Sequence, residues 1–124
     1  MAAVGVKLAQ VLAVVHARGV LHRDLKPANI FVIKQSGVDV VKVVDFGLAK
    51  LADDNAMSLT HTRQAMGTPH YMSPEQLLGE ALDERSDVWS LGVIFYELVY
   101  GRAPFGQSAT TLLGIMTEIA TKEP

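Results

Sequence analysis

The spacing of apolar and polar positions along the chain predicts three longer helices. In residues 2–18 apolar side chains recur three and four positions apart, which is typical of an amphipathic helix, and Gly19 is placed to end it. Residues 84–100 repeat this spacing on a broad apolar face, and residues 108–120 repeat it more weakly. The apolar face of residues 84–100 consists of Val88, Leu91, Ile94, Phe95, Leu98 and Val99.

A shorter helix is predicted from the residues at its two ends. Ser73 has the side chain of an N-cap, and Pro74 suits the first helical position because it lacks the backbone N–H that would be unpaired there. Gly79 is placed to end the segment. The stretch "SPEQLLG" therefore indicates a short helix.

Two runs rich in β-branched residues predict a small hairpin. These are "NIFVIK" and "VDVVKVVDF", which are separated by the turn-forming "QSG". Residues 45–70 show no regular spacing of apolar residues and are rich in Asp, Asn, Ser, Thr and His, so we expect a long loop there.

Composition and charge exclude several classes of protein. The 124 residues are 49% hydrophobic and 19% charged, which is typical of one globular domain. The formal net charge of −2 gives no electrostatic basis for binding nucleic acid or an anionic membrane. The lack of cysteine excludes disulfides and cysteine-based zinc sites within this sequence.

The sequence gives no sign of a membrane span or of export. Lys42, Asp45 and Glu97 interrupt the most hydrophobic stretches, so none approaches the roughly 18 apolar residues of a transmembrane helix. The start, "MAAVGVKLAQ", lacks the basic beginning and the continuous apolar core of a signal peptide. We therefore expect a cytoplasmic protein.

The stretch "HRDLKPANIF", residues 22–31, carries the candidate chemistry. Asp24, Lys26 and Asn29 lie between the first helix and the hairpin, and Asp45 follows the second strand. Because Asn29 and Asp45 flank the two strands, the hairpin can bring them to one edge, where an amide and a carboxylate oxygen suit Mg²⁺ on a nucleotide. Asp24 would then accept the proton of a substrate hydroxyl, and Lys26 would face phosphate.

Four motifs in this order resemble the catalytic half of a eukaryotic-type serine/threonine protein kinase. They are "HRDLKPAN", "VDFGLAK", "GTPHYMSPE" and "SDVWSLG", and the resemblance covers residues 4 to 118. The wording "YMSPEQ" is similar to the bacterial branch of the family. The resemblance implies an α+β, protein-kinase-like fold, with a mainly helical C-terminal lobe and a small β hairpin at the active site.

The resemblance also implies roles for individual residues. Asp24 looks like the catalytic base, and Asn29 and Asp45 look like the ligands of Mg²⁺ bound to ATP. Lys26 resembles the contact to the γ-phosphate in the serine/threonine class. Thr68 resembles the catalytic residue that ties Asp24 and Lys26 to the loop that binds the protein substrate.

Other positions match parts of the family that support the site. Phe31 resembles the apolar floor under the adenine ring, although by itself it is more simply a core strand residue. His22 and Phe46 resemble two members of the packed spine between the lobes, and Asp87 is similar to the anchor of the catalytic-loop backbone.

A regulatory expectation follows from the residue before the presumed base. In this family an arginine at the position of Arg23 usually accompanies control by phosphorylation of the loop, because a phosphate can pair with it and order the loop. We expect Thr60 and Thr62 to be the phosphorylated residues; the alternative is that they are solvated loop residues.

The four motifs match only the larger lobe of the family, and none of them belongs to its N-terminal lobe. We therefore expect residues 1–124 to be part of one kinase catalytic domain, with the N-terminal lobe and the last helices of the larger lobe outside them. The expected partners are a protein substrate and that lobe or the parent chain, and this chain alone is expected to be inactive. The alternatives are a non-catalytic kinase-homology module that acts by binding and, more distantly, a small-molecule phosphotransferase of related fold.

Overall fold

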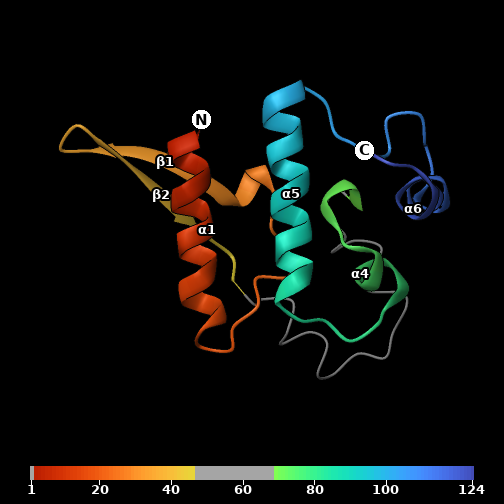
Figure 1. The fold of residues 1–124 in the computed structure, drawn as a ribbon, viewed down its shortest axis with the longest axis horizontal. Helices are drawn as coiled ribbons and strands as arrows, with labels where there is room; N and C mark the ends of the chain where they lie inside the picture. The colour runs from red at the N-terminus through yellow and green to blue at the C-terminus, as the bar shows by residue number, and fades with distance from the viewer. Residues whose placement is uncertain (1, 47–68) are drawn as a thin grey trace.

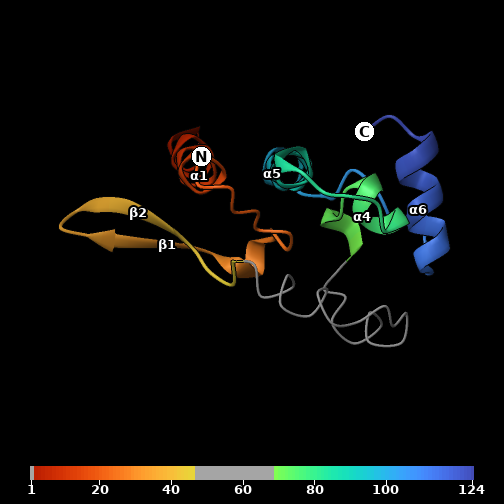
Figure 2. The same ribbon diagram turned by 90° about the horizontal axis from the view of Figure 1, so that it is seen from below.

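The described part of the chain is a row of helices with a two-stranded hairpin at one end (Figure 1, Figure 2). The computed structural model describes residues 2–46 and 69–124. Its elements are α1 (Ala2–His16), η1 (Pro27–Asn29), β1 (Ile30–Gln35), β2 (Val38–Val43), η2 (Pro69–Tyr71), α4 (Pro74–Leu78), α5 (Glu84–Tyr100) and α6 (Leu112–Thr121). Helices α1 and α5 lie side by side, the hairpin lies beyond α1, and α4 and α6 lie beyond α5.

Helix α1 ends slightly before the residue that the sequence predicts. The regular helix stops at His16, and the chain then closes with bonds from Gly19 N–H to the His16 carbonyl (2.9 Å) and from Val20 N–H to the Val15 carbonyl (3.1 Å). Gly19 has a φ of 71°, so this is a Schellman-type end that favours glycine. The glycine therefore ends the helix as predicted, with a turn between His16 and the glycine.

The predicted hairpin is confirmed. Strands β1 and β2 pair antiparallel, with Ile30 opposite Val43 and Gln35 opposite Val38. Within β2, Val41 is 8% exposed and packs into the core beneath α1. The hairpin therefore attaches to the helices through β2.

The two C-terminal helices begin at side-chain caps. In α4, Ser73 is the N-cap and Gly79 ends the helix in the left-handed conformation, both as predicted. Helix α6 begins at Leu112 and not at residue 108, because the Thr111 side chain accepts a bond from Gly114 N–H and fixes the start there.

Two clusters of buried apolar side chains hold the row together. The larger joins α1, the loop after it, β2 and α5, and the smaller joins α6 to the segment that precedes it. A Cβ atom added at Gly5 of α1 would lie 2.9 Å from the Phe95 ring, so glycine at this position permits the close approach of α1 and α5. The larger cluster comprises Leu8, Leu12, Leu25, Val41, Leu91 and Ile94, and the smaller comprises Phe105, Ile115 and Ile119.

Only part of the apolar face predicted for α5 is buried. Leu91 and Ile94 belong to the core, whereas Val88, Leu98 and Val99 are 55%, 46% and 74% exposed. Val88 and Val99 are about three helical turns apart and so lie on one side of the helix, and both are exposed. Across residues 2–46 and 69–124, no helix is long and apolar enough to cross a membrane.

Candidate functional site

The loop between α1 and β1 gathers the charged side chains of the "HRDLKPAN" segment. Lys26 Nζ lies 3.2 Å from Asp24 Oδ2, and the Asn29 side-chain amide donates to the Asp24 backbone carbonyl (2.9 Å) and more weakly to Asp24 Oδ2 (3.4 Å). Asn29 is 5% exposed, whereas the Asp24 side chain is 41% exposed. A buried, hydrogen-bonded asparagine therefore orients a carboxylate that remains open to solvent.

Asp87, in the first turn of α5, fixes the backbone of this loop. Its carboxylate accepts bonds from the His22 N–H (2.8 Å) and the Arg23 N–H (2.9 Å), and from Nε2 of His16 (2.7 Å). Asp87 is 1% exposed, and a buried carboxylate requires such donors because burial removes its hydration. The loop is thus held by one side chain from a helix 64 positions away.

His22 links the loop to the end of β2. The ring is fully buried; its Nδ1 accepts from the Asp24 N–H (3.2 Å), and its Nε2 donates to the Val44 carbonyl (2.8 Å). The Phe46 ring meets the His22 ring edge-on, with centroids 4.6 Å apart. These contacts place the segment after β2 against the loop that carries Asp24.

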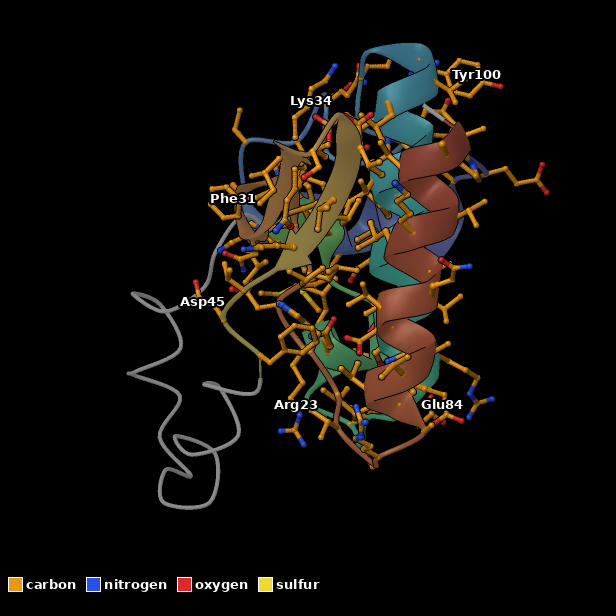
Figure 3. The ribbon with its side chains drawn as sticks, turned by 90° about the vertical axis from the view of Figure 1, so that its left-hand side faces the viewer. Arg23, Phe31, Lys34, Asp45, Glu84 and Tyr100 are labelled. Carbon is orange, nitrogen blue, oxygen red and sulfur yellow. The ribbon has the colours of Figure 1, made fainter. Side chains whose placement is uncertain are left out.

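The hairpin register brings Asp45 close to Asn29 along the same edge. The Val44 N–H donates to the Asn29 carbonyl (3.0 Å), and Asp45 is the next residue, exposed and with a φ of 61°. In Figure 3, Asp45 and Phe31 lie on the side of the molecule away from α1. Phe31 is 50% exposed, so the described residues do not bury it as a core strand residue.

A second polar contact lies beside the loop, between η2 and α5. The Tyr71 hydroxyl donates to Glu97 Oε2 (2.6 Å), and the Ser90 hydroxyl donates to the Tyr71 carbonyl (2.6 Å). Burial, followed by the hydrogen bond and the charge of Glu97, raises the pKa of Tyr71 to about 12. The tyrosine therefore stays neutral and bound to Glu97 at ordinary pH.

Comparisons with known proteins identify the family of this chain. The protein kinase domain matches residues 1–122. The chain belongs to the protein kinase family. Its matches include the serine/threonine-protein kinase Pkn1 of Myxococcus xanthus, which is 55% identical over 95 residues, or 76% of this chain and 14% of that protein.

Two further kinases show similar coverage. The serine/threonine-protein kinase pkn3 of Myxococcus xanthus is 47% identical over 112 residues, or 88% of this chain and 20% of that protein. The probable serine/threonine-protein kinase PknB of Bifidobacterium longum is 45% identical over 108 residues, or 86% of this chain and 15% of that protein. The chain thus spans a fifth or less of the length of these curated kinases.

The structure brings most of the predicted site residues of this kinase chain together. Asp24, Lys26 and Asn29 share one loop, and the hairpin register places Asp45 next to it. Thr68 and the predicted phosphorylation sites Thr60 and Thr62 lie outside the described residues.

Sequence reasoning did not find the partner of Asp87 on α1. His16 reaches 71 positions along the chain to this carboxylate. Its side chain is 15% exposed, and its position on the last turn of α1, just before the loop, is the one sequence feature that could have suggested the contact.

We predict that Asp87→Ala strongly destabilises the full-length protein. The substitution removes the acceptor of the buried His22 N–H and of the partly buried Arg23 N–H, and leaving a buried donor without its acceptor costs about 1–3 kcal/mol. The free energy of unfolding, measured by urea denaturation, should fall by about 3 kcal/mol or more. Asp83→Ala is the matched control, since Asp83 also accepts a backbone N–H at the start of α5 but is solvent-exposed, and its loss should be clearly smaller. Equal losses would contradict the assigned role of Asp87.

We also predict that ionisation of Tyr71 lowers the stability of the fold at alkaline pH. Because its folded pKa of about 12 lies above the model-peptide value of 10.0, this group stabilises the fold fully below pH 10 and loses that contribution as the pH rises through 12. Glu97→Gln should lower the pKa of Tyr71, since it removes the negative charge. NMR of ¹³C-labelled tyrosine against pH measures the change, with Tyr71→Phe to assign the resonance. An unchanged midpoint in Glu97→Gln would refute the coupling.

Proposed function

We propose that the full-length protein containing this chain transfers the γ-phosphoryl group of ATP to serine or threonine hydroxyls of a protein substrate. The observation that carries the proposal is the cluster of Asp24, Lys26 and Asn29, with Asp45 beside it, in a chain of the protein kinase family. The names of the relatives, which are 45–55% identical, support serine and threonine as acceptors. The proposal concerns the whole protein, because the chain covers only 14–20% of these relatives.

The residues at the edge of the hairpin suit a magnesium nucleotide. The Asn29 amide nitrogen is turned toward Asp24, which leaves its amide oxygen for a cation, and Asp45 supplies an exposed carboxylate. Mg²⁺, when bound there, would neutralise negative charge on the ATP phosphates. The half-exposed ring of Phe31 offers an apolar surface for the adenine.

The side chains in the loop then perform the transfer. As the substrate hydroxyl oxygen forms a bond to the γ-phosphorus, the bond from that phosphorus to the bridging oxygen of ADP breaks. The proton of the hydroxyl passes to the Asp24 carboxylate, which releases it to solvent after ADP departs. The Lys26 ammonium, 3.2 Å from Asp24 Oδ2, can turn to stabilise negative charge on the phosphoryl oxygens. Thr68 is proposed to tie this pair to the segment that binds the protein substrate.

Replacing the proposed base tests this function directly. Asp24→Asn in the full-length protein should lower kcat by about 100-fold or more, because general-base catalysis contributes at least that factor. The rate is measured as transfer of ³²P from ATP to a serine- or threonine-containing protein. Asp39→Asn, the same change at an exposed position of β2 near the end of the hairpin remote from the loop, should leave the rate unchanged.

Asp45→Ala tests the proposed role of Asp45 in holding Mg²⁺. It should remove the Mg²⁺ dependence of ATP binding, measured by calorimetry with and without the metal. A wild-type full-length protein that folds and binds ATP but transfers no phosphate would instead favour the non-catalytic module.

We further propose that Thr60 and Thr62 are phosphorylated in the active protein. A phosphate adds nearly two negative charges and can order a loop by pairing with an arginine, and Arg23 directly precedes the proposed base. Mass spectrometry of the active full-length protein should find phosphate on one or both threonines, and activity should fall in the double variant Thr60→Ala, Thr62→Ala. Detection of neither modification in an active preparation would sink this proposal.

A further inference from the structure

We propose that Gln76 is a positioning residue for the catalytic loop, and this inference rests on the proposed kinase function. Its side-chain Nε2 donates to the backbone carbonyl of Arg23 at 2.6 Å, across 53 positions of sequence. The acceptor belongs to the peptide bond that enters Asp24. Gln76 therefore connects α4 to the residue immediately before the proposed base.

This contact completes the restraint of one peptide plane. The carbonyl of the Arg23–Asp24 peptide is bound by Gln76, and its N–H donates to His22 Nδ1 (3.2 Å). The Arg23 N–H on the other side is bound by Asp87 (2.9 Å). Three side chains from three segments thus fix the backbone that sets the direction of the Asp24 carboxylate.

The restraint acts on a backbone conformation that needs support. Arg23 has a φ of 68°, in the left-handed region that a residue with a Cβ atom rarely adopts. Such a conformation persists where surrounding bonds over-determine it, and it relaxes when they are removed. Loss of the Gln76 bond should therefore reach Asp24 through the shared peptide.

The bond made by the amide oxygen of Gln76 fixes which way the amide group faces. Its Oε1 accepts from the backbone N–H of Ser73 (3.0 Å), and the Ser73 hydroxyl accepts from the Gln76 N–H (3.3 Å), which together form the capping box of α4. Because the Ser73 N–H can only donate, the amide oxygen faces it and the amide nitrogen faces Arg23. One side chain thus caps α4 and holds the catalytic loop.

This double role distinguishes glutamine from glutamate, the other residue that suits this position of a capping box. A glutamate completes a capping box equally well, since its carboxylate also accepts from the N-cap N–H. It cannot donate to the Arg23 carbonyl, because an ionised carboxylate has only acceptor atoms. Gln76→Glu therefore keeps the cap, removes the bond to the loop and sets a second acceptor against the Arg23 carbonyl.

The test compares Gln76→Glu with the wild-type full-length protein. We expect kcat to fall about ten-fold, the equivalent of one lost hydrogen bond in the transition state, while the KM for ATP stays within about two-fold. If Gln76 only stabilised α4, the substitution would not lower kcat while leaving both the KM for ATP and the melting temperature unchanged. Gln107→Glu is the matched control, because Gln107 also donates through Nε2 to a backbone carbonyl, that of Ala103, but at an exposed site. It should leave kcat unchanged.

Hydrogen–deuterium exchange provides a readout that does not need activity. The peptide covering residues 21–25 should exchange several-fold faster in Gln76→Glu than in the wild type or in Gln107→Glu. If Gln76→Glu does not fold, Gln76→Met, which is neutral and of similar length, should show the same loss of kcat and faster exchange. Wild-type kcat and exchange in the folded Gln76 variant would overturn the inference. If the wild-type protein transfers no phosphate, the kinase proposal fails, and the exchange comparison alone decides the role of Gln76.

Discussion

The buried carboxylate of Asp87 is the interaction on which the site depends. Three donors reach it, the backbone N–H groups of His22 and Arg23 and the imidazole of His16, so α1, the loop and α5 meet at one group. Its place in the first turn of α5 adds the favourable field of the helix N-terminus. The Asp87 carboxylate is 1% exposed, and its burial is tolerated because these donors replace water. The loop must therefore keep the conformation in which its N–H groups reach the carboxylate.

Two residues beside the site hold a costly backbone conformation. Arg23 and Asp45 have φ values of 68° and 61°, and the left-handed region costs a residue with a Cβ atom about 1–2 kcal/mol. Arg23 is restrained on both sides by bonds from α4 and α5, while the residue before Asp45 is bound to Asn29 and His22. The local geometry of the chemistry is thus imposed by the tertiary fold and is not a preference of the loop sequence.

The parts that could be predicted from the sequence are those encoded locally. Ser73, with Pro74 and Gly79, marks α4 because caps act over a few residues. The β-branched runs on either side of the turn-forming "QSG" mark the hairpin that places Asp45 near the loop. Family resemblance predicted that Asp87 anchors the loop backbone, and its bonds from the His22 and Arg23 N–H groups confirm this. The bond from His16 to Asp87 and the bond from Gln76 to the loop join positions more than fifty residues apart, and no local pattern encodes them. For the same reason apolar spacing identifies α5 as a helix but not which of its faces α1 covers.

The register of the hairpin has a consequence for how the chain can change in length. Asn29 and Asp45 flank the base of the two strands, whereas Ser36 and Gly37 form the turn at the far end. Adding paired residues near that turn lengthens both strands together and leaves the base unaltered. A single residue inserted into one strand below the turn shifts the pairing and moves every side chain beyond it to the opposite face. Divergent members can therefore vary in hairpin length, provided that they do so symmetrically.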